Sequence, residues 1–170
     1  MFTFTNNILV TGGAGYIGSH IIELLVKKKF KVFIYDNLVT GYKKLINKKA
    51  VFIEGDIKNS KLLIKTINEN NINSIIHLAG YLNISEGQKN KKKYYKNNVI
   101  GTLNLVKACK NSTVKNIIFS SSCSIYGNIK GSVSEKNIPK PKSYYAFTKY
   151  KSEEIIKKYG KKFNFKYGIL

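Results

Sequence analysis

The chain has 170 residues, 43% of them hydrophobic, and a mean hydropathy of −0.22, values typical of a single globular domain with a substantial core. No stretch approaches the roughly 18 consecutive apolar residues of a membrane-spanning helix, so we expect no membrane partner. The net charge of +21 comes from lysine alone. Because arginine is preferred for bidentate recognition of bases and phosphates, its absence argues against a nucleic-acid partner, and A/T-rich coding is a simpler source of the lysines.

The N-terminal sequence and the cysteine content both bear on the cellular compartment of the protein. The start, "MFTFTNNILVTGG", lacks a basic region followed by a separate apolar segment, so it is interpreted as a mature strand and not as a signal peptide. Cys109 and Cys123 are the only cysteines, too few for a disulfide framework or a metal cluster. We therefore expect a cytoplasmic protein without a bound metal.

Apolar, β-branched runs alternate with segments of helical spacing along the chain. The predicted strands are 7–11, 31–36, 50–56, 74–80, 116–122 and 166–170. Helical faces are predicted around 17–25, 63–67, 99–106 and 143–160, with a loop or short helix at 37–49. Strands that are apolar throughout and alternate with helices predict an α/β, doubly wound, Rossmann-type parallel sheet.

The last predicted strand, in "FKYGIL", begins as a buried strand at the end of the chain. We expect residues 1–170 to form one dinucleotide-binding domain, incomplete at about its sixth strand, of a longer protein whose substrate-binding domain lies elsewhere. By itself this piece is expected to show no measurable turnover.

The stretch "LVTGGAGYIGSH" contains two overlapping glycine patterns between a predicted strand and a predicted helix. Gly13, Gly15 and Gly18 form G-x-G-x-x-G, whereas Gly12, Gly15 and Gly18 form G-x-x-G-x-x-G. Glycines in this context allow backbone N–H groups to approach a pyrophosphate at a helix N-terminus. The sequence therefore predicts a dinucleotide site here.

The next predicted strand ends in Asp36, 18 positions beyond Gly18. A carboxylate at this place accepts hydrogen bonds from the adenosine ribose hydroxyls and repels a 2′-phosphate, which favours NAD over NADP. Asp56 and Ile57 end the following strand, where an adenine would lie, although Asp56 is also placed to cap the helix beginning near Asn59.

The fourth predicted strand ends in Leu78, Ala79 and Gly80, which would lie beneath the dinucleotide, and the small residues among them let it pass close to the backbone. His77 precedes them in an apolar run and is interpreted as a satisfied core histidine.

Tyr145 and Lys149 lie four residues apart on a predicted helix and therefore share one face. A nearby ammonium group and a positive nicotinamide ring would lower the pKa of the tyrosine, which could then accept a proton from a substrate hydroxyl. Ser122 ends the fifth predicted strand at the same sheet edge. The sequence thus predicts a Ser122, Tyr145 and Lys149 catalytic set.

The ordered motifs "TGGAGYIGS", "DNL", "EGDI", "HLAG", "YYKNNVIGTLNL", "SSSCSIYG" and "YYAFTK" resemble those of the extended short-chain dehydrogenase/reductase (NAD-dependent epimerase/dehydratase) family. They are most similar to the 4-epimerases that interconvert UDP-glucose and UDP-galactose. This resemblance implies NAD as a retained cofactor, a nucleotide-sugar substrate, a Tyr145 base, a transient 4-keto sugar and a possible homodimer. It also implies cofactor contacts from these residues: Gly12, Gly15, Tyr16, Ile17, Gly18, Asp36, Asn37, Asp56, Ile57, Leu78, Ala79, Gly80, Asn98, Tyr145 and Lys149.

Two departures from the family pattern leave alternatives open. Leu82 stands where many of these epimerases have a lysine that helps to hold cofactor phosphate. The stretch "SSSCS" lacks the acid pair of the related dehydratases, which disfavours dehydration. Another nucleotide-sugar enzyme of the family (a decarboxylase or a different epimerase) is one alternative. The other is a non-catalytic domain that binds a dinucleotide or, through its positive charge, RNA.

Overall fold

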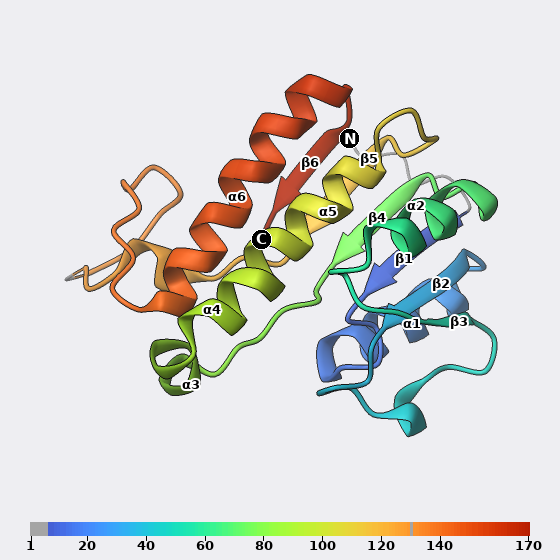
Figure 1. Cartoon of the computed structure of the whole chain (residues 1–170), viewed down its shortest axis with the longest axis horizontal. Helices are drawn as coiled ribbons and strands as arrows, with labels where there is room; N and C mark the ends of the chain where they lie inside the picture. The colour runs from blue at the N-terminus through green and yellow to red at the C-terminus, as the bar shows by residue number, and fades with distance from the viewer. Residues whose placement is uncertain (1–6, 130) are drawn as a thin grey trace.

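The computed structural model describes residues 7–129 and 131–170, which contain a sheet of six parallel strands (Figure 1). The strand order is β3-β2-β1-β4-β5-β6. The strands are β1 Asn7–Thr11, β2 Lys31–Asp36, β3 Val51–Glu54, β4 Ser74–His77, β5 Asn116–Phe119 and β6 Lys166–Ile169. This order reverses direction between β1 and β4, and open α/β sheets bind ligands outside the strand ends at such a point. The predicted fold class is confirmed.

The longer helices are those expected from the apolar spacing. They are α1 Tyr16–Lys27, α2 Ser60–Glu69, α5 Gly101–Ala108 and α6 Tyr144–Phe163. Smaller elements, which the sequence pattern did not reveal, are α3 Ile84–Lys89, α4 Lys91–Tyr94, the π-helix η2 Tyr95–Ile100 and the 3₁₀-helix η3 Cys123–Tyr126. The predicted loop at 37–49 contains the short 3₁₀-helix η1 Lys43–Leu45. None of the helices in the described ranges is long and apolar enough to cross a membrane.

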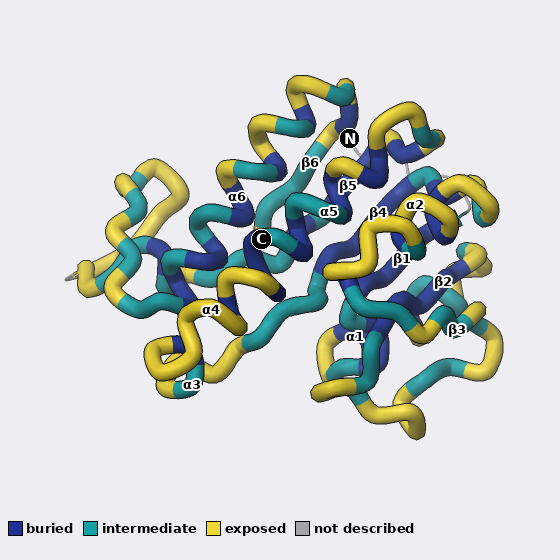
Figure 2. The backbone as a smooth tube through the Cα atoms, viewed as in Figure 1, coloured by how far each residue is buried: buried dark blue, intermediate teal, exposed yellow. Residues whose placement is uncertain are grey.

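Alternation along the strands divides the core into two parts. Leu9 and Tyr35 face a cluster formed with α2, α5 and α6, whereas Val10 and Ile34 face a smaller cluster with α1. Period-two alternation sends successive side chains to opposite faces, so a strand covered on both faces reads as uniformly apolar. Figure 2 shows the resulting buried central strands, with exposed residues on the outer helix faces.

Local hydrogen bonds set where the helices begin. The side chain of Asn59 accepts from the backbone N–H of Leu62 and caps α2, and Ser143 accepts from Ala146 and caps α6. The alternative role of Asp56 as the cap of α2 is therefore wrong. Its carboxylate accepts a hydrogen bond from the Lys58 N–H in the preceding turn.

Candidate functional site

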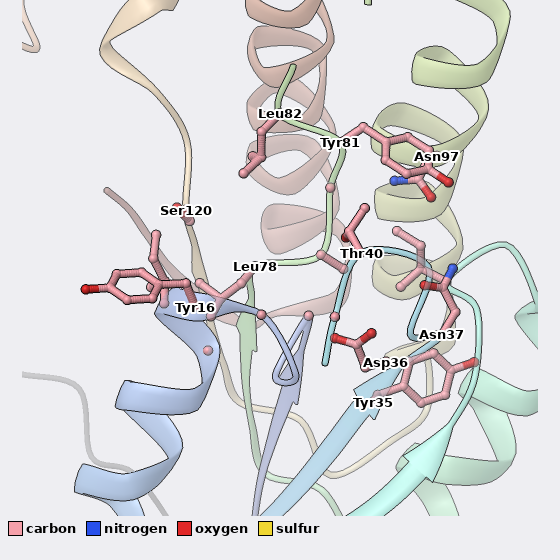
Figure 3. Close-up of a pocket in the computed structure, with 18 of the residues that line it drawn as sticks. Tyr16, Tyr35, Asp36, Asn37, Thr40, Leu78, Tyr81, Leu82, Asn97 and Ser120 are labelled. Carbon is pink, nitrogen blue, oxygen red and sulfur yellow. The ribbon is translucent and has the colours of Figure 1, made fainter. Parts of the chain in front are cut away.

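A cavity of about 380 Å³ lies at the carboxyl ends of β1, β2 and β4, where the strand order reverses (Figure 3). Its walls come from the glycine turn after β1, the loop after β2, the segment after β4 and one face of α6. Predicted site residues that line it are Gly12, Gly15, Tyr16, Ile17, Gly18, Asp36, Asn37, Ile57, Leu78, Ala79, Gly80, Tyr145 and Lys149. Asp56, Asn98 and Ser122 lie behind or beside this lining.

The two glycine patterns are separated by the structure. Gly12, Gly15 and Gly18 line the cavity, whereas a side chain on Gly13 would lie 2.7 Å from Ile22 and 2.8 Å from Ile34 in the α1 core. Gly12 has φ of +73°, and a Cβ there would lie 2.7 Å from the Ala79 nitrogen. The turn is thus a cradle that side chains would fill, and it opens at the N-terminus of α1.

Asp36 ends β2 with its carboxylate directed into the cavity beside the glycine turn (Figure 3). One carboxylate oxygen accepts from the Ala14 N–H at 3.0 Å, and the other accepts from the Leu38 N–H at 2.8 Å. The side chain is only 8% exposed. These bonds hold the anion in place while each oxygen keeps a further lone pair for a ligand hydroxyl.

Of the two residues predicted to lie near the adenine, only one faces the cavity. Ile57 lines the cavity, whereas the Asp56 carboxylate accepts from the Asn37 amide at 3.0 Å and pairs with Lys58 at 3.2 Å. Although burial acts in the opposite direction, the hydrogen bonds from Lys58 and Asn37 hold the pKa of Asp56 below its usual value. Asp56 therefore positions Asn37, which does line the cavity.

Asn98 lies on the π-helix η2 and fixes the segment after β4. Its amide oxygen accepts from the Tyr81 N–H at 2.8 Å, and its NH₂ donates to the Tyr81 carbonyl at 3.1 Å and to the Thr148 hydroxyl at 3.1 Å. The neighbouring Asn97 lines the cavity instead. π-Helical turns of this kind commonly occur at functional sites.

Lys149 reaches the cavity from α6 as a buried cation. It is 4% exposed, its Nζ lies 4.5 Å from the centre of the Phe119 ring, and its ammonium group has no hydrogen bond to another described residue. Burial lowers the pKa of Lys149 to about 8, and the Glu153 carboxylate partly opposes that change. A buried ammonium with three free donors is suited to ligand hydroxyls.

Tyr145 stands one helical turn before Lys149 and lies near Ser122, whose hydroxyl is paired with that of Ser124 at 2.8 Å. Burial raises the pKa of Tyr145, and the nearby Ser122 hydroxyl opposes this change by favouring the phenolate. In the protein without cofactor desolvation dominates this pKa. The predicted lowering of the pKa also requires the positive nicotinamide ring, so it stays a prediction.

Ser122 lines a second hollow of about 390 Å³, which shares Ser121 with the first. Tyr145 lines the first hollow and Ser122 the second. The two side chains therefore meet at the boundary between the two hollows.

His77 is fully buried between the hydroxyls of Thr11 at 2.7 Å and Thr102 at 2.9 Å. It does not line the cavity, in agreement with its interpretation as a core residue.

Several lining residues were not predicted from the sequence. Thr40 and Gly41 belong to the loop that covers Asp36, and the Tyr42 N–H closes it by donating to the Ala14 carbonyl at 2.9 Å. A Cβ on Gly41 would lie 2.8 Å from an Asp36 carboxylate oxygen. The lone glycine in this polar segment was therefore the feature of the sequence that could have indicated a close contact with Asp36. The remaining additions are Tyr35, Gly55, Tyr81, Leu82, Asn97, Ser120 and Ser121.

The chain is similar in sequence and in structure to proteins of known function. A UDP-glucose 4-epimerase of Lactobacillus helveticus is 39% identical over 150 residues, which are 88% of this chain and 46% of that protein. The crystal structure of the Brucella ovis UDP-glucose 4-epimerase in complex with NAD has a TM-score of 0.93 at 36% identity, covering 97% of this chain and 51% of that one.

The Thermotoga maritima enzyme with UDP-glucose has a TM-score of 0.92 at 32% identity, covering 96% of this chain and 54% of that one. The chain thus spans about half the length of these relatives. The model of the NAD dependent epimerase/dehydratase family matches residues 8–170. The resemblance inferred from the motifs is confirmed, together with the cofactor that the family description names, and the chain belongs to the NAD-dependent epimerase/dehydratase family.

Proposed function

We propose that this chain is the NAD-binding half of a nucleotide-sugar 4-epimerase that interconverts UDP-glucose and UDP-galactose. The observation that carries the proposal is the junction of the two hollows. Tyr145 and the buried Lys149 cation face the cavity of the glycine turn, and Ser122, which lies near Tyr145, faces the second hollow. A sugar hydroxyl at this junction would reach the serine and the tyrosine at once.

The cavity fits NAD in three respects. The turn at Gly12, Gly15 and Gly18 leaves room for a pyrophosphate that side chains would remove. The Asp36 carboxylate, held by two backbone N–H groups, accepts ribose hydroxyls and disfavours a 2′-phosphate. Lys149 presents a cation with free donors at the opposite end.

The residues of this chain would act on the proton while NAD, when bound, supplies hydride acceptance and return at the sugar C4 carbon. Ser122 orients the C4 hydroxyl, and Tyr145 accepts its proton and later gives it back. Lys149 holds a ribose hydroxyl and, by its charge, favours the phenolate once a positive cofactor ring adds to the local field. This proposal also includes the identity of the sugar, the contacts to UDP, the assembly into a homodimer and the extent of the domain.

The test joins residues 1–170 to the second half of the Lactobacillus helveticus relative and measures conversion of UDP-galactose to UDP-glucose without added NAD. We expect turnover by the chimera and none by the 170-residue chain. Tyr145→Phe should lower turnover by about 10²- to 10⁴-fold, the usual contribution of acid–base catalysis. Tyr144→Phe, on the adjacent residue, is the matched control.

Two results would overturn the proposal. Conversion of another nucleotide sugar, but not UDP-galactose, would favour a different enzyme of the family. Binding of NAD without turnover of any nucleotide sugar, together with salt-sensitive retention of RNA, would favour a non-catalytic binding domain.

A further inference from the structure

A line of buried hydrogen bonds crosses the molecule beneath the cavity. The Thr11 hydroxyl at the end of β1 lies 2.7 Å from Nδ1 of His77, and Nε2 of His77 lies 2.9 Å from the Thr102 hydroxyl on α5. These three residues are at most 1% exposed. None of them lines the cavity, so the proposed cofactor contacts leave this line unexplained.

The direction of each hydrogen bond follows from the donors available. The Thr102 hydroxyl lies 2.6 Å from the Asn98 carbonyl oxygen, which can only accept, so its single hydrogen is used there. Towards His77 the same hydroxyl must accept, and Nε2 must therefore carry hydrogen. In a neutral ring Nδ1 is then the acceptor, and the Thr11 hydroxyl donates to it.

The charge state of the ring agrees with this assignment. Burial lowers the pKa of His77 to about 3, and the Lys149 cation acts in the same direction. The Phe119 ring covers one side of the imidazole at 5.4 Å between ring centres. The imidazole ring is therefore neutral over the pH range in which most proteins work, and its tautomer does not change in that range.

Both ends of the line reach walls of the cavity. The Ala79 N–H donates to the Thr11 hydroxyl oxygen at 3.4 Å, and Thr11 directly precedes Gly12 of the glycine turn. At the other end Asn98 holds both backbone groups of Tyr81 and donates to the Thr148 hydroxyl, next to Lys149 on α6. The line thus connects the glycine turn, the segment after β4 and the proposed catalytic helix.

We propose that His77, locked as the neutral Nε2–H tautomer, is a positioning residue that sets the placement of the glycine turn relative to α6. This inference rests on the proposed function, since the quantity it sets is the fit of NAD between these walls. A histidine that only fills space would not need an assigned tautomer, and its partners could be replaced without changing the affinity of the folded protein.

The first test needs no cofactor. Long-range ¹H–¹⁵N NMR spectra of the 170-residue chain should show His77 as the Nε2–H tautomer, unchanged between about pH 5.5 and about pH 8. His20, the other histidine, is exposed on α1, and His20→Asn assigns the two sets of signals. An Nδ1–H tautomer, or a His77 signal that titrates in this range, would overturn the proposal even if NAD binds.

The second test uses a matched pair on α5. Thr102→Val keeps the side-chain shape but removes the hydroxyl between His77 and Asn98, whereas Thr102→Ser keeps it. Loss of this contact should weaken NAD binding about five- to tenfold in the valine variant, and the serine variant should stay close to the parent. Thermal unfolding and far-ultraviolet circular dichroism establish that each variant is folded.

If Thr102→Val does not fold, Thr11→Val interrupts the line at its other end and is measured in the same way, with Thr11→Ser as its control. A folded valine variant with unchanged NAD affinity would show that the line only supports stability and would overturn the proposal. Failure of the parent chain to bind NAD would instead refute the proposed function, while the tautomer measurement would still stand.

Discussion

The buried Lys149 cation should cost the folded protein stability, so Lys149→Met is expected to stabilise it. Burial lowers the pKa of this lysine from 10.5 to about 8. At about 1.4 kcal/mol for each pH unit, this lowering costs the folded state about 3 kcal/mol at pH 7. The lost contact with the Phe119 ring offsets about 1 kcal/mol, and methionine fills similar space, which leaves a net gain of about 2 kcal/mol.

The gain should depend on pH in a defined way. Below the folded pKa of about 8 both the folded and the unfolded parent bind the proton, so the full cost is present. Between that value and the unfolded pKa of 10.5 the unfolded chain keeps its proton and the folded chain releases it. The parent therefore gains stability as the pH rises through this range, and the advantage of Lys149→Met shrinks.

The assay is urea unfolding followed by circular dichroism at about pH 7 and about pH 10. Lys158→Met, on an exposed lysine of the same helix, is the control and should change the free energy of unfolding by less than about 0.5 kcal/mol. A less stable Lys149→Met variant at pH 7, or a difference equal at both pH values, would refute the reasoning. The same variant should lose NAD affinity, so stability and binding are expected to move in opposite directions.

Three further substitutions test the cavity walls. Asp36→Asn removes one of the acceptors used by the Ala14 and Leu38 N–H groups, and it removes the charge that repels a 2′-phosphate. Fluorescence titration should therefore show a smaller preference for NAD over NADP. An unchanged preference would contradict the role of Asp36. Gly12→Ala should lower the free energy of unfolding by about 2–4 kcal/mol, because φ is +73° and the new Cβ would meet the Ala79 nitrogen at 2.7 Å. Gly131→Ala, at φ of +87° in open space, should cost only about 1–2 kcal/mol, and equal losses would refute the steric argument. Leu82→Lys adds a cation at the cavity rim and should tighten NAD binding in a salt-sensitive way, whereas an effect independent of salt, or the same effect with Leu82→Met, would exclude electrostatics.

The carboxyl ends of β1 and β2 were predictable because each apolar run stops at a polar residue, Thr11 and Asp36. Asp36 lies at the sheet edge for this reason. The expected strands at 50–56, 74–80 and 116–122 extended too far, since backbone pairing stops two or three residues before the apolar or small residues do. Most of these extra residues line the cavity instead, namely Gly55, Leu78, Ala79, Gly80, Ser120 and Ser121.

Other parts of the site depend on contacts that spacing does not encode. The π-turn at Tyr95–Ile100 directs Asn97 to the cavity and Asn98 to the Tyr81 backbone, whereas the sequence showed only a helical asparagine pair. The pKa of Tyr145 depends on how deeply α6 buries it, and proximity to Lys149 along the helix did not reveal that burial. Tertiary burial and side-chain direction decided both features.

We expect the glycine turn, Asp36 and Lys149 to hold NAD together. This expectation can be tested by isothermal titration of the 170-residue chain with NAD and with NADP. One NAD should bind per chain, at least about tenfold more tightly than NADP, which corresponds to about 1.4 kcal/mol. Absence of NAD binding by the folded chain, or equal affinity for the two dinucleotides, would contradict it.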